Sequence, residues 1–573
     1  MKTRIITALF FALGLFSCED FLETPPADTL TDETYWTNEA SVRTFSYGFY
    51  TAYFTGYGSG NTWGRYFSGQ GLNDDFAPSA PAQFTPNAVP ATASAAGWTF
   101  TWVRKANIFI NRVQQVPMEQ AAINHWRGIG RFFRGMEYHD LVKNFGDVPW
   151  YSNSLTESEV EQLYKPRDSR TLVMDSVLAD FRYAAEHVRL ENGTKGLTVN
   201  KDVVLAYMSR IFLFEGTWQK YHNNNSAKAA EYLEAAKWAA NEVIKSGRYR
   251  LGNYREVFNS LSLVGNPEVI LYREYVAGTL THALNSYNNK EPQTGPSKDL
   301  IDSYLANDGL PIDLSPAYKG DQGIANQMAN RDPRIAQTFV TSQLRLNGIA
   351  GNYSTTGIAT HKFLNESIKD LPEGSLSGNP TDAPVIRYGE VLINYAEAAA
   401  ELATVGGPAL TQNDLDISVN VLRSRPGINI PHLQVVSGEP AVNGQVYDDP
   451  DRDPSVPAMI WEIRRERRIE LVFEGFRLDD LKRWKKLEYT NTVTNPEINM
   501  GAWIRKADHP GISAAVVLDK DQADTEGYIT PAWTAATQRT SIPDKYYLNP
   551  LPLDQIVLYK ERGVTLTQNP GWE

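Results

Sequence analysis

Apolar residues recur at helical spacing along two long stretches of the chain, with polar residues at the positions between them. Recurrence at every third or fourth position is typical of helices that bury one face. The pattern predicts helical segments at about 39–53, 98–116, 119–145, 170–189, 200–216, 227–246, 386–404, 412–425 and 455–475. Asp168-Ser169 and Asn200 stand where two of these helices begin, and their short polar side chains suit helix N-caps.

Short turns join several of these helices, and the polar turn at 223–226 is one of them. Long helices joined by short turns pack as antiparallel hairpins. No regular 34-residue consensus is visible, so the pattern favours stacked helical hairpins without showing a strict repeat. We therefore expect a mainly α fold.

Three stretches break the helical pattern with glycine, asparagine, proline and short apolar runs, at about 55–97, 250–385 and 485–573. They predict irregular loops with few short strands, and long loops in compact domains are usually functional. The helical frame would then comprise about 39–53, 98–246 and 386–484. No linker separates these parts, so we expect residues 35–573 to form a single body.

The only cysteine of the 573 residues, Cys18, directly follows a short apolar run. Lys2 and Arg4 precede that run, which is typical of a secretory signal and is too short to span a bilayer. Leu15-Phe16-Ser17-Cys18 resembles the site at which bacterial lipoproteins are cleaved and acylated. We expect residues 1–17 to be a signal peptide and 18–34 a lipidated tether. An ordinary signal peptide with a chance cysteine is the alternative.

Composition is that of a large globular protein, with 42% hydrophobic and 21% charged residues. A formal net charge of −12 argues against nucleic acid as a partner, because binding phosphates requires a basic face. Without a second cysteine, disulfides and thiolate metal sites are excluded from the mature chain. Aromatic residues reach 11%, which fits carbohydrate or peptide binding and equally a well-packed core.

Enzyme and metal motifs are missing from the sequence, which contains no HExxH, no P-loop and no GxSxG. Asp449, Asp451 and Asp453 alternate like the start of a calcium loop, but Pro454 occupies the position that requires glycine. A solvated acidic turn is the better interpretation. We expect no catalytic residue, no metal and no cofactor.

A charged segment, Trp461 to Phe476, carries four arginines alternating with glutamates. Spacings of three and four residues would pair Glu462 with Arg465 and Arg467 with Glu470 along one helix. This predicts a structural helix bearing salt bridges rather than a nucleic-acid patch.

Several short sequence motifs follow one another along almost the whole chain. They are Cys18 to Glu23, Tyr35-Trp36, Trp98 with Ala106-Asn107, Tyr138 to Val142 with Phe145 to Pro149, Arg331 to Arg334, Arg387-Tyr388 with Asn394 to Ala398, Arg464 to Trp484, and Leu548 to Pro552 with Gln568 to Trp572. Together they resemble the SusD/RagB family of outer-membrane lipoproteins of Bacteroidota.

The resemblance implies a frame of tetratricopeptide-like helical hairpins carrying large irregular insertions. It implies a lipoprotein anchored in the outer membrane and exposed at the cell surface, seated on a SusC-like TonB-dependent transporter. Such a protein captures oligosaccharide, or in some members peptide, and passes the nutrient to the transporter without catalysing a reaction. A lipid-anchored glycan-degrading enzyme and a purely structural lid are the rival hypotheses.

Family members build their ligand platform from the N-terminal loop region, the helix near the Trp98 motif and middle loops. Aromatic faces would stack on sugar rings, and carboxylates and amides would bind hydroxyl groups. The residues in the corresponding stretches are Trp63, Tyr66, Asp74, Asp75, Trp98, Trp102 and Asn107, with Tyr287 a looser candidate.

Overall fold

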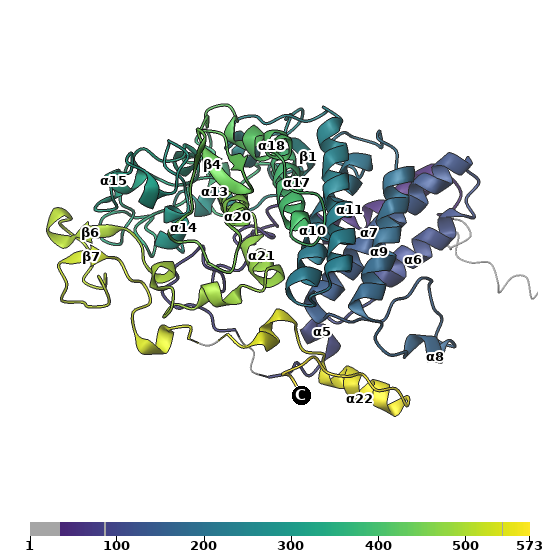
Figure 1. Cartoon of the computed structure of the whole chain (residues 1–573). Helices are drawn as coiled ribbons and strands as arrows, with labels where there is room; N and C mark the ends of the chain where they lie inside the picture. Colours follow the sequence, from purple (N-terminus) through teal and green to yellow (C-terminus); the bar gives the residue numbers. More distant parts are fainter. Residues whose placement is uncertain (1–34, 85–87, 541) are drawn as a thin grey trace, which may run out of the picture.

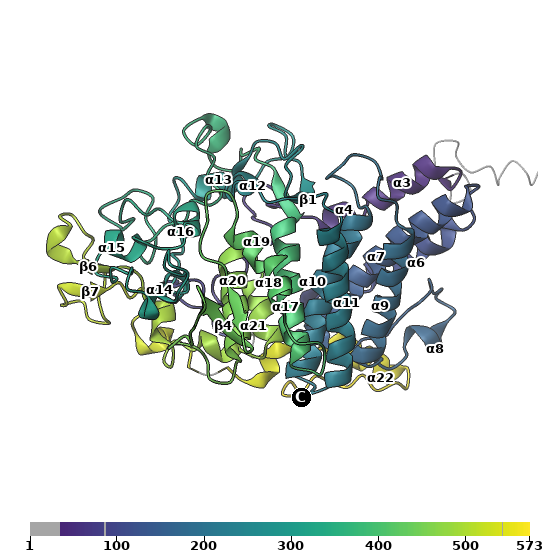
Figure 2. The same ribbon diagram turned by 45° about the horizontal axis from the view of Figure 1, so that its top comes forward.

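Six long helices pack side by side, each against the next one in chain order (Figures 1 and 2). The computed structural model describes residues 35–84, 88–540 and 542–573, so Cys18 and the predicted signal and tether lie outside the described residues. The six helices are α6 (Thr101–Val113), α7 (Gln120–Phe145), α9 (Arg170–His187), α10 (Lys201–Tyr221), α11 (Ser226–Lys245) and α17 (Tyr388–Ala403). The predicted frame of helical hairpins is confirmed.

Local sequence sets where these helices begin and how closely they approach. Ser169 and Asn200 are the N-caps of α9 and α10, and each side chain accepts a hydrogen bond from the first turn. Two glycines of α7 leave room for its neighbours. A Cβ on Gly130 would lie 2.6 Å from Ile110 of α6, and one on Gly135 would lie 2.8 Å from Phe181 of α9. The mid-helix cost of glycine is therefore offset by close packing.

The predicted helix at 412–425 is wrong as a single element. Two short helices replace it, α18 (Gln412–Asp416) and α19 (Val419–Arg423), with Ser418 in a non-helical conformation between them. The Asn420 side chain exchanges hydrogen bonds with the backbone of Leu433, which holds the second helix against the following strand region. Such side-chain bonds to backbone compete with helix continuation.

The remaining helices are short or lie beside the long ones. They are α3 (Glu39–Tyr47), α4 (Tyr50–Tyr53), α5 (Ala93–Ala96), α8 (Val160–Leu163), α12 (Glu256–Asn259), α13 (Leu284–Tyr287), α14 (Lys298–Asp302), α15 (Ile324–Met328), α16 (Arg334–Thr338), α20 (Ala458–Glu470), α21 (Arg477–Arg483) and α22 (Leu553–Glu561). No helix of the described residues is long and apolar enough to cross a membrane.

Three small antiparallel sheets lie in the loop-rich half. Their strands are β1 (Val269–Arg273) with β2 (Ala383–Arg387), β3 (Gln434–Val436) with β4 (Glu439–Val442) and β5 (Gln445–Val446), and β6 (Trp503–Arg505) with β7 (Glu526–Tyr528). In Figure 1 the β6–β7 ribbon lies at the end of the molecule opposite α6. The expectation of a mainly helical protein with few short strands is confirmed.

The two largest hydrophobic cores of the described residues lie one among the long helices and one among the loops, and two smaller clusters accompany them. Helix α20 contributes to both, because Ile463 packs into the first core and Ile469 into the second. Strand β1 likewise places Ile270 in the first core and Tyr272 in the second. These two elements therefore join the helical half to the loop-rich half.

A buried ion network lies where the two halves meet, with Glu470 at its centre. Its carboxylate is 2.6 Å from nitrogens of both Arg387 and Arg425 and 3.2 Å from Arg334. Antiparallel pairing of β1 with β2 brings Glu268 beside Arg387, and their charged atoms are 2.9 Å apart. All five side chains are almost inaccessible to solvent.

The charges of α20 thus pair mostly with other elements. The predicted pair of Glu462 with Arg465 is present at 3.3 Å. The predicted pair of Arg467 with Glu470 is wrong, because Arg467 binds Asp480 of α21 at 2.8 Å. Buried charges need close partners from every side, and a single helix face cannot supply them.

Burial alone would raise the pKa of Glu470, but Arg425, Arg387 and Arg334 outweigh it and lower the pKa to about 2. The folded-state pKa lies below the ordinary value of 4.5. The stabilisation from this group is therefore complete above about pH 4.5 and is lost as the pH falls toward 2. The lowering of this pKa corresponds to roughly 3 kcal/mol of folding stability above pH 4.5.

We expect Glu470→Gln to lower the free energy of unfolding at pH 7 by about 3–5 kcal/mol, because three arginines lose their shared carboxylate. The variant should also lose less stability than wild type between pH 4.5 and pH 3. Urea denaturation midpoints at these pH values measure both effects, with the exposed Glu157→Gln as the control. A variant with the wild-type midpoint and pH profile would contradict this role.

Candidate functional site

A groove of about 440 Å³ opens between the start of α6, the segment after α7, and the helices α8 and α22. In Figure 1, α22 runs below α5, on the same side of the molecule as α8. Residues from all these elements line it: Ala93, Trp98, Thr99, Phe100, Thr101, Val103, Arg104, Asn107, Tyr151, Asn153, Ser154, Leu155, Leu163, Tyr164, Gln555, Leu558 and Tyr559. We call this site the aromatic groove, because five of its lining side chains are aromatic.

Edge-to-face contacts hold these rings in place. Trp98 packs at right angles to Phe100 with centroids 5.4 Å apart, and Phe100 packs in the same way on Tyr151. Tyr164, directly after α8, packs edge-to-face on Tyr559 of α22, with ring centroids 5.4 Å apart. Aromatic pairs favour this geometry, so the rings form walls of fixed orientation.

Asn107 of α6 fixes one wall of the groove. Its amide nitrogen donates hydrogen bonds to the carbonyl oxygens of Tyr151 and Asn153, at 2.9 and 3.0 Å. Its amide oxygen accepts a hydrogen bond of 2.8 Å from Arg134 of α7. Arg134 is itself paired with Asp180 of α9 at 2.7 Å. Asn107 is only 1% exposed, so it positions the segment at 151–153.

The polar groups of the groove are mostly neutral. Burial, followed by the neighbouring Tyr559, raises the pKa of Tyr151, and its hydroxyl donates to the carbonyl oxygen of Leu163 at 2.8 Å. The phenol therefore stays protonated. Hydroxyl and amide groups beside aromatic rings can bind sugar hydroxyls but do not form an acid–base pair.

Trp98 and Asn107 are the two sequence-predicted residues that line the groove. Trp102 lies on the same helix and does not line it. Its ring instead packs on Phe49, and the Lys105 ammonium lies 4.6 Å from its centroid. The ligand roles of all eight predicted residues stay predictions. Trp98 and Asn107 are only 4% and 1% exposed, so the geometry favours them as supports of the groove wall.

Trp63, Tyr66 and Tyr287 gather in the second core, apart from the groove lining. The ring centroids of Trp63 and Tyr287 are 4.2 Å apart. The Trp63 side chain is partly exposed, whereas Tyr287 and Tyr66 are buried. This second aromatic cluster therefore presents mainly the indole of Trp63 to solvent.

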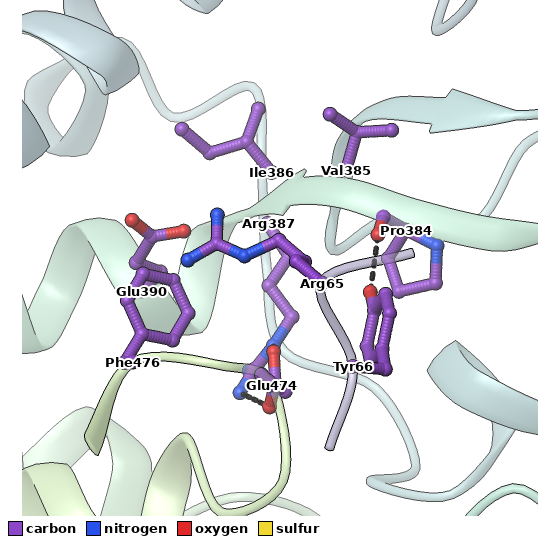
Figure 3. A pocket seen from close by; sticks show the side chains of 9 residues that line it. All are labelled: Arg65, Tyr66, Pro384, Val385, Ile386, Arg387, Glu390, Glu474 and Phe476. Atoms are coloured by element: carbon purple, nitrogen blue, oxygen red, sulfur yellow. Dashed lines mark hydrogen bonds and ion pairs between the residues drawn. The ribbon is translucent and has the colours of Figure 1, made fainter. Parts of the chain in front are cut away.

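Tyr66 also borders a second cavity, which Figure 3 shows at close range. Its volume is only about 10 Å³, which is room for about one water molecule. The Arg65 guanidinium lies 4.1 Å from the ring centroid of Phe476 and faces Glu390 there (Figure 3). The hydroxyl of Tyr66 donates to the carbonyl oxygen of Pro384. This cavity is too small for a sugar ring.

Asp74 and Asp75 are buried and bound by arginines. A nitrogen of Arg477 lies 2.6 Å from Asp74, and one of Arg468 lies 2.8 Å from Asp75. Burial alone would raise the pKa of Asp74, but Arg477 and Arg468 hold it well below its usual range. The two carboxylates tie their loop to α20 and α21, and they do not line the groove.

The alternating aspartates of the predicted acidic turn also take part in structural bonds. Asp449 accepts a hydrogen bond from the indole of Trp461 at 2.7 Å, and Asp453 pairs with Lys486 at 2.8 Å. In the part of the chain that the structure describes, no group of three or more metal-ligating side chains is placed to hold an ion.

The sequence matches a known protein family. The sequence profile of the SusD family matches residues 267–572, more than half of the chain. The chain belongs to the SusD family. The predicted family is thus confirmed, and with it the prediction of a binding protein rather than an enzyme.

Curated relatives of this SusD-family chain include two SusD-like proteins from Formosa agariphila. SusD-like protein P38 is 23% identical over 533 residues, which cover 89% of this chain and 97% of the relative. SusD-like protein P2 is 23% identical over 509 residues, which cover 85% of this chain and 91% of the relative.

Solved structures show the same fold. A SusD-like carbohydrate binding protein from Bacteroides fragilis superposes with a TM-score of 0.65 at 22% identity, covering 91% of this chain and 98% of its own. The surface glycan-binding protein A from Bacteroides fluxus gives a TM-score of 0.58 at 16% identity, covering 93% and 100%. At these identities the similarity establishes the fold.

Most residues of the groove could not be recognised from the sequence. Tyr151, Tyr164 and Tyr559 come from segments up to about 400 positions apart, and none stands in a motif. Their only sequence signal is the aromatic surplus of the whole chain.

We expect Asn107→Ala to loosen the groove wall, because two carbonyl oxygens and one arginine lose their shared partner. Hydrogen exchange of the amides at 151–155 should become about tenfold faster, the equivalent of about 1.4 kcal/mol. Asn111→Ala is the matched control, since Asn111 makes only a 3.5 Å contact with Ser154. Unchanged exchange at 151–155 would show that Asn107 does not position this wall.

Proposed function

We propose that this SusD-family chain binds a glycan in the aromatic groove and delivers it to a SusC-like TonB-dependent transporter of the outer membrane. The observation that carries the proposal is a 440 Å³ groove with five aromatic rings and neutral hydroxyl and amide groups. Binding sites of small molecules combine an apolar lining with a few polar groups in the same way.

The chemical groups of a sugar ring match the lining of the aromatic groove. A sugar ring has apolar C–H faces, which stack on aromatic rings, and hydroxyl groups at its edge, which need hydrogen-bond partners. Phe100, Tyr151 and Tyr164 are partly exposed and supply ring surface, while Asn153 and Gln555 supply amides. The similarity to carbohydrate- and glycan-binding proteins of the same fold supports this ligand class.

The proposals of a lipid anchor and of a transporter partner rest on the sequence. Cys18 and the preceding apolar run support acylation at the membrane, and 18–34 would tether the body above its transporter. Acyl chains bind membranes through their buried methylene groups, and two or more chains give stable anchoring. An exposed groove on a tethered body is suited to capture rather than to turnover.

We expect Tyr164→Ala to weaken glycan binding about tenfold, because it removes one wall of the groove. Trp63→Ala removes a partly exposed indole outside the groove and should leave binding unchanged, which would withdraw Trp63 from the predicted ligand residues. Affinity electrophoresis of the full-length protein against a panel of glycans and peptides compares the variants. Retention that depends on Trp63 and not on Tyr164 would move the site to the second aromatic cluster. Binding of peptides alone, or cleavage of a glycan, would contradict the proposal.

We expect Cys18→Ala to abolish incorporation of labelled fatty acid and to leave the precursor uncleaved, because acylation requires the thiol. Metabolic labelling followed by membrane fractionation measures both effects. Ser17→Ala keeps a small residue before the cysteine and should be processed normally. Normal labelling of the Cys18 variant would refute the predicted anchor.

A further inference from the structure

The charged side chains at the aromatic groove are unevenly distributed. Arg104 is the one charged residue among the lining residues that the structure describes, although the whole chain carries a formal charge of −12. Two further cations lie against lining rings. The Lys165 ammonium is 5.6 Å from the centroid of Tyr151, and the Arg562 guanidinium is 5.2 Å from that of Tyr164.

We infer that the aromatic groove takes glycans that carry negative charge, as carboxylate or sulfate groups, and that Arg104 is the residue that selects them. The inference rests on the proposed glycan-binding function and names the ligand class of that same site. A guanidinium can bind either anion through paired N–H donors, which gives a strong and directional contact.

The environment of Arg104 keeps it available to a ligand. Its side chain is exposed, and one of its terminal nitrogens donates a hydrogen bond to the carbonyl oxygen of Leu155, another lining residue. This bond directs the guanidinium along the groove wall. Among the described residues, Arg104 forms no ion pair with a carboxylate, so no internal anion neutralises it.

Carboxylates near the groove are bound within the protein to different degrees. Asp168 pairs with Lys165 at 2.5 Å, whereas Asp554 of α22 accepts a hydrogen bond of 3.0 Å from the amide of Ala93 through one oxygen and leaves the other buried without a partner among the described residues. Glu159 accepts from the amide and the hydroxyl of Thr156. None of these three carboxylates belongs to the lining, and no other carboxylate stands among the lining residues that the structure describes.

The start of α6 adds partial positive charge on the same side. Thr99, Phe100 and Thr101 line the groove, and the helix of 13 residues begins at Thr101. Its N-cap Phe100 offers no side-chain acceptor, and no acidic residue stands in the first turn. The N-terminal end of a helix favours anions, so this end supports the guanidinium rather than opposing it.

Paired oligosaccharides test the inference by calorimetry with the full-length protein. One pair is an oligogalacturonide and its carboxyl-reduced form, and the other is a sulfated galactan oligosaccharide and its desulfated form. In at least one pair we expect the charged member to bind about tenfold more tightly than its neutral form. The pair that shows the difference identifies the anion as carboxylate or sulfate.

Arg104→Gln should lower the affinity for the charged member about tenfold and that for the neutral member much less, and Arg104→Lys should recover part of the loss for the charged member. Arg112→Gln, on the same helix but outside the groove, is the matched control and should change neither. Continued binding of the neutral member shows that the groove is still formed.

Equal binding of charged and neutral members, or equal loss for both in Arg104→Gln, overturns the charge selection while the glycan-binding function stands. If no oligosaccharide of the panel binds, charged or neutral, both the inference and the proposed function fail at this site. A preference for the charged member that Arg104→Gln does not reduce overturns the assignment to Arg104.

Discussion

The buried contact of Glu470 with three arginines is the constraint on which the rest of the structure depends. An ionised carboxylate is costly to remove from water, and it is retained only where several cations surround it. Here those cations come from the end of β2, from the loop after α19 and from α16. The helical half and the loop-rich half must therefore meet in one arrangement for the charges to be satisfied.

The same principle operates on a smaller scale at the aromatic groove. Asp180 neutralises Arg134, Arg134 binds Asn107, and Asn107 holds two carbonyl oxygens of the segment at 151–153. Irregular backbone cannot satisfy its own polar groups as a helix does, so buried side chains must do so. A loop built in this way is a defined wall, which allows a pocket to keep its shape before a ligand arrives.

The charge at the aromatic groove is positive, whereas the net charge of the whole protein is negative. The chain is acidic, yet Arg104 is the one charged residue among the described lining residues. The Arg562 guanidinium lies over the ring of Tyr164, and Lys165, which is paired with Asp168, lies over that of Tyr151. Net charge governs the field far from the protein, whereas a ligand in a groove responds to the nearest groups. An acidic protein can thus hold a site suited to an acidic ligand.

Sequence alone determined the long helices and the caps of two of them, because helical periodicity and the Ser169 and Asn200 signals are local. The sequence also determined the family, through motifs spread over the chain, and it pointed to Trp98 and Asn107, which line the aromatic groove. Only the tertiary structure decided that Glu470 pairs with distant arginines, and that Asp74 and Asp75 bind arginines away from the groove. Burial and long-range contacts set those partners, and spacing along one segment carries no information about them.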